Sequence, residues 1–308
     1  MIRHTFSEPR PFPGQDPWVV PFASSLLLVQ SVWGDRRIVI RRIPSLERMH
    51  ECEDTVIWAP RGGDHARQIW APELHHIDGR WYVYFCASDG ANRNHRVYVL
   101  EADNPFGPYR DLGKVFDALH DAWAIDLTIL RCGEQLHAVW SGWEDDREVE
   151  GDGATQNLYI AAMSTPWAIS GERHLISTPE HGWEKSVAAI NEGPQVLRNP
   201  TDGGVFIVYS ADASWTHEYK LGVLEQVGSD VTDPASWRKH PHPLLVGGGH
   251  GCFVDTPAGT QVVYHRKTTA EPGWADRVIC HEPLTWDADG CPVVGPDAAR
   301  GAPDRASV

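Results

Sequence analysis

A two-strand pattern recurs five times along this chain and constrains its fold more than any other feature of the sequence. Each copy has a turn and an aromatic-rich strand, then a polar excursion and another apolar strand. The turns with their first strands are residues 23–32, 78–88, 132–143, 202–213 and 258–267. The strands that follow are residues 36–43, 95–103, 156–164, 219–227 and 275–284. The turns recur roughly every 55 residues, with one longer interval of about 70, and no long amphipathic helix competes.

This repeat length predicts the fold class. It fits the blade of a β-propeller better than the turn of a solenoid. A blade is a four-stranded antiparallel sheet, and five such blades fill the 308 residues. We therefore predict an all-β chain in which residues 1–308 form a single five-bladed β-propeller around a central channel. We expect no appended carbohydrate-binding domain.

One polar residue precedes each of the five turns. These residues are Asp16, Glu73, Asp126, Glu192 and His250. They lie roughly six to eleven residues before their turns, which places each of them near one end of the first strand of its blade. Because the first strand of each blade lines the central channel, we expect these five groups to converge on one axial pit.

The surroundings of the three candidate carboxylates differ. Glu192 stands beside Gly193 and Pro194, where the backbone allows close approach and lacks a ladder donor. Asp126 lies in an otherwise apolar strand, where a carboxylate needs partners or a role. The alternatives are a solvated strand end for Glu192 and an ordinary Asp-Pro turn for Asp16.

Composition narrows the partners and the compartment. The net charge of −15 argues against nucleic acid or an anionic membrane as partner. The six cysteines have no metal-binding spacing, and we interpret them as reduced. The N-terminus has no apolar leader and no run is long enough to span a membrane, so we predict a cytoplasmic location unless a signal peptide has been removed. The fourteen tryptophans offer flat faces suited to sugar rings.

Five separated segments of the chain resemble the signature segments of glycoside hydrolase family 43. They are D-P-W at 16–18, W-A-P-E at 70–73, A-I-D at 124–126, N-E-G-P at 191–194 and G-H-G at 249–251. The resemblance covers nearly the whole chain and is strongest to the α-L-arabinofuranosidase branch. It implies a five-bladed propeller that hydrolyses arabinofuranosides or xylosides with inversion.

The resemblance also implies roles for four residues. Asp16 would be the general base, Glu192 the general acid, and Asp126 the group that orients the acid and raises its pKa. His250 would lie beside an ion or a water in the channel, often calcium in relatives. The chemistry itself requires no cofactor, and we expect at most a structural calcium or sodium ion.

Five further residues are predicted to contact an oligosaccharide or polysaccharide substrate. They are Trp70, Glu73, Trp143, Trp215 and Arg277. Trp70 is a stacking surface, and Glu73 either binds a sugar hydroxyl or braces another side chain. Trp143 opens the acidic segment 143–155, which we place beside the cleft. Trp215 is expected at the rim, and Arg277 is expected to bind a carboxylate.

Several alternatives stay open at this stage. The preferred activity is release of terminal α-L-arabinofuranosyl residues from arabino-oligosaccharides or arabinosylated hemicellulose. A β-xylosidase of the same family is the first alternative activity, since both sugars present similar hydroxyl patterns. Inversion requires carboxyl groups roughly 6.5–9.5 Å apart, whereas a retaining fructofuranosidase-like enzyme needs about 5–5.5 Å. A non-catalytic propeller that binds sugar or protein is the third alternative. The turn after Asp16 reads Ala-Ser-Ser rather than Asp-Gly-aromatic, so we expect an irregular first blade.

Overall fold

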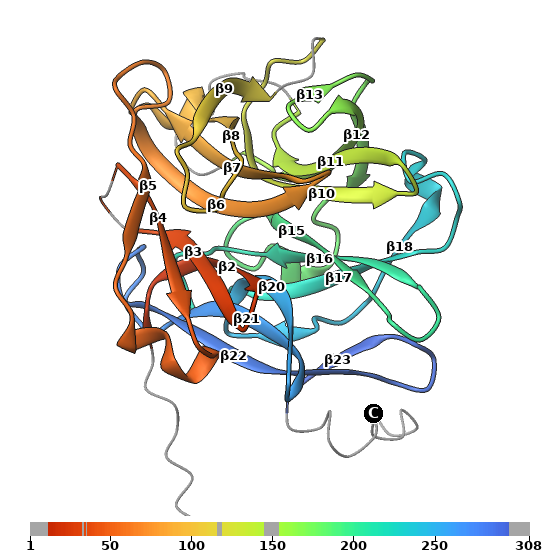
Figure 1. The fold of residues 1–308 in the computed structure, drawn as a ribbon. Coiled ribbons are helices and arrows are strands. Elements are labelled where there is room, and N and C mark those ends of the chain that lie inside the picture. The colour runs from red at the N-terminus through yellow and green to blue at the C-terminus, as the bar shows by residue number, and fades with distance from the viewer. Residues whose placement is uncertain (1–11, 33, 35, 116–118, 145–153, 296–308) are drawn as a thin grey trace, which may run out of the picture.

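The chain forms five blades of antiparallel strands around a central channel (Figure 1). The computed structural model describes residues 12–32, 34, 36–115, 119–144 and 154–295. Blade one is β2 (Gln15–Phe22), β3 (Ser25–Ser31), β4 (Ile38–Ile43) and β5 (Thr55–Trp58). Blade two is β6 (Arg67–Ile77), β7 (Arg80–Ser88), β8 (Arg96–Ala102) and β9 (Arg110–Val115). The all-β five-bladed propeller predicted from the sequence is thus confirmed.

Blades three and four each divide their outermost strand into two short pieces. Blade three is β10 (Ala124–Cys132), β11 (Gln135–Gly142) and β12 (Asn157–Thr165), with β13 (Ala168–Ile169) and β14 (His174–Ser177) both paired to β12. Blade four is β15 (Asn191–Arg198), β16 (Val205–Ala211) and β17 (Lys220–Gln226), with β18 (Trp237–Lys239) and β19 (Leu245–Val246) both paired to β17. The predicted second and third strands of every blade agree with these bounds to within a few residues.

Blade five draws its strands from both ends of the described chain. It contains β20 (Gly249–Thr256), β21 (Gly259–Lys267), β22 (Arg277–Trp286) and β23 (Pro292–Val294), and β1 (Phe12–Pro13) pairs with β22. Phe12 lies opposite Ile279, and Pro13 lies opposite Val278. This pairing closes the ring, so that the red first blade lies against the blue fifth blade in Figure 1. The assignment of all residues 1–308 to a single domain remains a prediction, because the blades are built from residues within 12–294.

The expectation of an irregular first blade is wrong. β2 and β3 form a regular hairpin in which Phe22 pairs with Ser25 across the two-residue turn Ala23–Ser24. A turn of this length needs a positive φ at one or both central residues, and Ala23 adopts φ 52°. Pairing along the strands therefore outweighs the modest cost of a left-handed alanine.

Each innermost strand carries a β-bulge at the same level of the channel. The ladder register shifts between Gln15/Trp18, Trp70/Glu73, Ile125/Thr128, Glu192/Gln195 and Gly249/Cys252. Two residues of the inner strand thus face one residue of the second strand. The first bulge residue has a left-handed φ in every blade: Asp16 51°, Ala71 46°, Asp126 56°, Gly193 50° and His250 50°. Three of these residues precede a proline, which suits a position that gives no N–H to the ladder.

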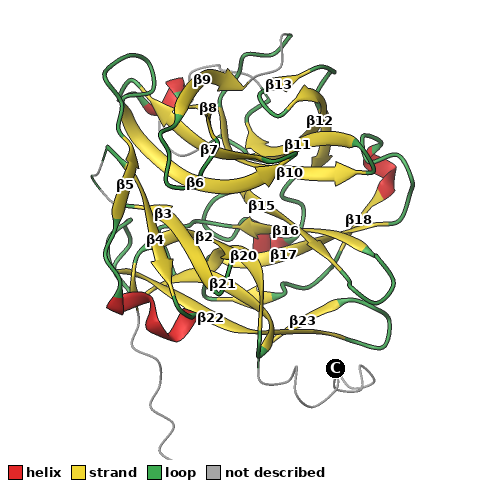
Figure 2. Cartoon of the chain, viewed as in Figure 1, coloured by secondary structure: helices red, strands yellow, loops and turns green. Residues whose placement is uncertain are grey.

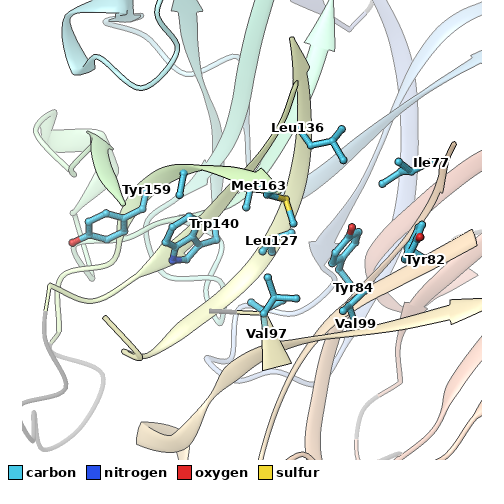
Figure 3. Close-up of a cluster of buried hydrophobic side chains, with 13 residues drawn as sticks. Ile77, Tyr82, Tyr84, Val97, Val99, Leu127, Leu136, Trp140, Tyr159 and Met163 are labelled. Atoms are coloured by element: carbon cyan, nitrogen blue, oxygen red, sulfur yellow. The ribbon is translucent and has the colours of Figure 1, made fainter. Parts of the chain in front are cut away.

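Apolar clusters between neighbouring blades hold the ring together. Figure 3 shows the cluster between blades two and three, in which Tyr84 and Val99 from one blade face Leu127 and Trp140 from the next. All four side chains are buried. The helices of the described residues are short 3-10 turns (Figure 2), so the sheets rather than helices position the central site.

Candidate active site

A cavity of about 270 Å³ opens at the end of the channel where the innermost strands begin. Its lining includes one predicted residue from each blade: Asp16, Trp70, Asp126, Glu192 and His250. The bulges explain this convergence, since a left-handed residue at the same level of each strand turns the local chain toward the axis. The predicted meeting of Asp16, Asp126 and Glu192 in one depression is confirmed.

Asp16 lies beside two histidine rings. Its Oδ1 lies 3.6 Å from His250 Nδ1 and 3.4 Å from His265 Nδ1. Burial acts to raise the pKa of Asp16, but His250, Arg277 and a hydrogen bond from Ser31 outweigh it and lower the pKa below the ordinary value. Asp16 is therefore ionised at neutral pH, as a general base must be.

Glu192 and Asp126 form a buried pair with the opposite behaviour. Burial is the main cause that raises the pKa of Glu192 to about 7, with the negative charge of Asp16 adding to it. The Tyr219 hydroxyl donates to Glu192 Oε1 at 2.9 Å and opposes this rise. Burial, followed by the charge of Glu192, also raises the pKa of Asp126 well above its usual range. The pair consequently retains a proton near neutral pH.

Gly193 connects the two carboxylates through its backbone. Its N–H donates to Asp126 Oδ2 at 3.0 Å, so the strand of blade four that carries Glu192 is hydrogen-bonded to the Asp126 carboxylate of blade three. A Cβ at this position would lie 3.1 Å from both His250 Nδ1 and Ser210 Oγ, and φ is 50°. Glycine is therefore required for both the conformation and the close approach.

Three of the other bulge N–H groups donate hydrogen bonds to side chains, and each acceptor comes from the second strand of the preceding blade. Ala71 N donates to Ser31 Oγ at 2.6 Å, His250 N to Ser210 Oγ at 2.7 Å, and Asp16 N to His265 Nδ1 at 3.1 Å. These acceptors pair with the residue just before the bulge in their own blade, as in Gln15 opposite Ser31. Blades one, four and five thus each hold the bulge residue of the blade that follows.

His250 lies between two carboxylates, with its Nδ1 3.6 Å from Asp16 Oδ1 and 3.9 Å from Asp126 Oδ2, and the His265 ring lies 6.2 Å away between centroids. His265 Nδ1 accepts a hydrogen bond, so its neutral ring carries the proton on Nε2, and this buried atom has no hydrogen-bond partner. An N–H donor cannot ligate a cation, but a water would satisfy it. An ion in the channel stays a prediction, and no step below uses one.

Aromatic side chains form two walls of the cavity. Trp70 and Trp123 line one side, where His95 stacks on Trp70 with a ring separation of 3.9 Å. Trp215 and Trp274 line the other side, with ring centroids 5.5 Å apart. These walls provide the stacking surfaces expected for a sugar ring.

Two of the predicted substrate contacts lie outside the cavity lining. Trp143 stacks behind Trp123 at 4.4 Å with the rings nearly parallel, so it supports the wall rather than forming it. Most of the acidic segment that follows it, residues 145–153, lies outside the described residues. Glu73 stands two residues beyond the bulge residue Ala71, which places it roughly 6–7 Å further down the channel.

Glu73 serves there as a brace. It accepts hydrogen bonds from Gln195 Nε2 at 2.5 Å and from His75 Nε2 at 2.8 Å. Gln195 belongs to blade four and Glu73 to blade two, so this contact crosses the channel. Of the two roles considered for Glu73, its position fits bracing.

Arg277 lines the cavity, but its guanidinium binds neutral groups. It donates to Gln15 Oε1 at 2.9 Å and to the Ser214 carbonyl at 2.7 Å. Its Nε is buried without a hydrogen-bond partner. Its charge lowers the pKa of both Asp16 and Glu192.

Sequence reasoning missed Trp123, Tyr219, His265 and the second-strand serines. The second strands do carry a signal for part of this set. The residue that pairs just before each bulge is Ser31, Cys86, Ser141, Ser210 or His265, a small polar group or an imidazole at one fixed place in an apolar strand. Tyr219 and Trp123 lie in connecting segments, where no such regularity exists.

Comparison with known proteins gives consistent results. The sequence profile described as Glycosyl hydrolases family 43 matches residues 12–292. An extracellular exo-α-(1→5)-L-arabinofuranosidase of Streptomyces chartreusis is 34% identical over 253 residues, which are 76% of this chain and 74% of that protein. α-L-Arabinofuranosidase 43 of Humicola insolens is 31% identical over 273 residues, which are 85% of this chain. The chain spans about half of the length of the Humicola protein, 52%.

Solved structures agree with these relatives. The crystal structure of an α-L-arabinofuranosidase from Lactobacillus brevis superposes with a TM-score of 0.81 at 30% identity, covering 92% of this chain and 94% of the other. A thermostable family-43 glycoside hydrolase at 22% identity, with a TM-score of 0.80, has the same fold. Among the described residues, no helix has the length and apolar composition to span a bilayer. The cytoplasmic location stays a prediction.

Proposed function

Since this chain belongs to glycosyl hydrolase family 43, we propose that it is an inverting α-L-arabinofuranosidase that releases terminal arabinofuranosyl residues. Asp16 is the general base and Glu192 the general acid. Asp126 is a positioning residue. It accepts a hydrogen bond from the N–H of Gly193, the neighbour of Glu192, and so orients the strand that carries the general acid. Its own raised pKa helps to keep one proton shared between Asp126 and Glu192.

The reaction needs two proton transfers on opposite sides of the sugar ring. Glu192 donates its proton to the glycosidic oxygen as the bond to the anomeric carbon breaks. Asp16 accepts a proton from the water that attacks the same carbon from the other face. The product leaves with inverted configuration, and the proton on Asp16 returns to Glu192 through solvent before the next turnover.

The observation that carries this proposal is the opposite shift of two carboxyl pKa values in one cavity. Asp16 has a lowered pKa, while Glu192 has a pKa of about 7. A pair of carboxyl groups whose environments push their pKa values apart is the arrangement that acid–base hydrolysis of a glycoside uses. A sugar-binding propeller without catalysis gains nothing from holding one buried carboxyl protonated beside an ionised one.

The shape of the site supports removal of terminal sugars. A cavity of about 270 Å³ lies slightly below the usual size range of small-molecule sites, roughly 300–1,000 Å³. The tryptophan walls on two sides bound it further. Such a pit suits a chain end better than the middle of a polymer. The names of the Streptomyces chartreusis and Lactobacillus brevis relatives refer to arabinofuranosides, and we infer the same substrate class here.

A panel of aryl glycosides tests the proposal. We expect hydrolysis of the aryl α-L-arabinofuranoside to exceed that of the β-D-xyloside and the β-D-fructofuranoside. Proton NMR during the first minutes should show the inverted anomer as the initial product. A preference for the xyloside would identify a β-xylosidase, and a retained anomer would contradict the assigned mechanism.

Two variants test the residue roles. Glu192→Gln should lower kcat/KM on an arabino-oligosaccharide by about 10²–10⁴, with a smaller loss on an aryl substrate whose leaving group needs little protonation. Asp16→Asn should lower activity strongly on both. Asp255→Asn is a matched control, because Asp255 is exposed and lies near the opposite end of the inner strand β20. Equal losses on both substrates for Glu192→Gln would contradict its role as the acid.

A further inference from the structure

Three side chains with metal-binding atoms meet at the outer side of blade four. Glu225 lies in β17, His240 directly follows β18, and Cys291 lies in the turn before β23 of blade five. A carboxylate oxygen, a ring nitrogen and the sulfur of these residues lie within 4.8 Å of one another. None of the three lines the catalytic cavity. All three are partly buried, so an ion from solvent reaches them without opening the fold.

The backbone holds the ligands from two blades in place. His240 N donates to the Val223 carbonyl at 2.9 Å, and the ring Nε2 lies 3.0 Å from Glu225 Oε2. Cys291 is fixed by a closed turn, in which Asp287 N donates to Cys291 O at 2.9 Å and Cys291 N donates to Asp287 Oδ1 at 2.9 Å. Because these donors are already ordered, binding an ion costs little conformational entropy.

The donor set selects the metal. A thiolate, an imidazole and a carboxylate are the three ligand types that Zn²⁺ uses, and three protein ligands leave the fourth tetrahedral position for water. Bond lengths of about 2.0–2.3 Å in a tetrahedron place ligand atoms roughly 3.3–3.7 Å apart, which small side-chain rotations reach from the observed spacing. We propose that Glu225, His240 and Cys291 bind Zn²⁺ and thereby join blade four to the β22–β23 hairpin of blade five.

Arg238 competes with the ion for the carboxylate. Its Nη2 lies 2.6 Å from Glu225 Oε1 and 2.7 Å from Oε2. The Arg238 side chain is 63% exposed, and an ion pair of that kind contributes little to stability because water screens it. The guanidinium can therefore turn into solvent when an ion arrives. It follows that Arg238→Gln, which removes the competing cation, should tighten zinc binding.

Proton release accompanies binding at this site. Zn²⁺ binds the thiolate, so the Cys291 thiol must lose its proton. Zinc affinity should therefore fall as the pH is lowered, since protons compete with the ion for the sulfur.

Cobalt substitution of the full chain tests the ligand set directly. A thiolate bound to Co²⁺ gives a charge-transfer band in the near ultraviolet, which reports sulfur ligation without reference to enzyme activity. We expect this band to saturate at one equivalent of Co²⁺ in the wild type. Cys291→Ser should abolish it. Cys132→Ser is the matched control, because Cys132 is also a partly buried free cysteine but lies in blade three, and it should keep the band.

Zinc competition and thermal unfolding complete the test. Zn²⁺ should displace Co²⁺ and raise Tm in the wild type and in Cys132→Ser, but it should not raise Tm in Cys291→Ser. Zinc affinity should increase in Arg238→Gln. Hydrolysis by Cys291→Ser should stay at the wild-type level, so this test stands apart from the proposed function. Absence of the band in the wild type, or its persistence in Cys291→Ser, would overturn the proposal.

Discussion

The hydrogen bond between Tyr219 and Glu192 sets the upper pH limit of the proposed enzyme. The hydroxyl donates to Oε1 at 2.9 Å and favours the ionised form of the acid. Removing it by Tyr219→Phe leaves burial as the dominant influence and raises the pKa of Glu192 above its present value of about 7. A hydrogen bond to a charged group contributes about 1.5–3 kcal/mol, and one pKa unit corresponds to about 1.4 kcal/mol, so we expect the pKa to rise by roughly one to two units.

The pH dependence of kcat/KM measures this shift. Its alkaline limb reports loss of the proton from the general acid of the free enzyme. The limb should lie near pH 7 in the wild type and roughly one to two pH units higher in Tyr219→Phe. An arabinoside with a poor leaving group is the suitable substrate, because its hydrolysis depends on protonation. The maximal rate should also fall, since the carboxyl loses an orienting contact.

A matched variant separates this effect from general damage to the fold. Tyr82→Phe also removes a tyrosine hydroxyl that donates to a buried glutamate, Glu101 Oε1 at 3.1 Å, but in blade two and outside the cavity lining. Its pH profile should match that of the wild type. An unchanged alkaline limb in Tyr219→Phe, or one displaced to lower pH, would refute the assignment of Glu192 as the acid held by Tyr219.

Three further predictions concern stability and geometry. The pKa of Glu192 is about 7 in the folded protein against an ordinary 4.5, so this residue destabilises the fold as the pH rises from ~4 to ~8. Over that range the unfolding free energy of Glu192→Gln should rise relative to the wild type by up to about 3 kcal/mol. Urea titration at several pH values measures this, and a difference that stays constant with pH would contradict it. Gly193→Ala should destabilise the protein by about 1–2 kcal/mol because its φ is 50°. It should also lose most of the activity, because the new Cβ would press against His250 and Ser210. Gly203→Ala is the control: its φ is 78° and the space around it is open, so it should lose stability but not activity. Ser210→Ala leaves the buried His250 N–H without its acceptor and should lower the unfolding free energy by about 1–3 kcal/mol, which an unchanged Tm would disprove.

The catalytic centre could be predicted from the sequence to a large extent because its residues belong to a repeat. Asp16, Asp126 and His250 occupy equivalent bulge positions, and Glu192 directly precedes the fourth one. Equivalent positions on the innermost strands of a closed ring all face the axis, so the spacing of these residues along the chain was enough to predict that they meet there. Glu73 shows the limit of this reasoning. It stands two residues past its bulge, and a difference of two residues along a strand moves a side chain to a different depth.

Residues outside the repeat could not be placed in this way. Tyr219, Trp123 and Trp274 reach the site from connecting segments, whose paths depend on the packing of neighbouring blades rather than on strand periodicity. The protonation states are likewise a tertiary property. They follow from burial and from charges that residues far apart in sequence bring to each carboxyl.

The sequence by itself determined the five-fold repeat, the all-β propeller and the level of the channel at which the carboxylates meet, because local turn chemistry and strand alternation are written residue by residue. Only the tertiary structure decided how the ring closes through Phe12 and Pro13, which acid holds its proton, and that Glu225, His240 and Cys291 share one place. The cysteines have no metal-binding spacing along the chain, yet folding brings one of them to a histidine and a glutamate of another blade. Spacing along a chain reports contacts within a repeating unit, whereas contacts between units depend on how their surfaces pack.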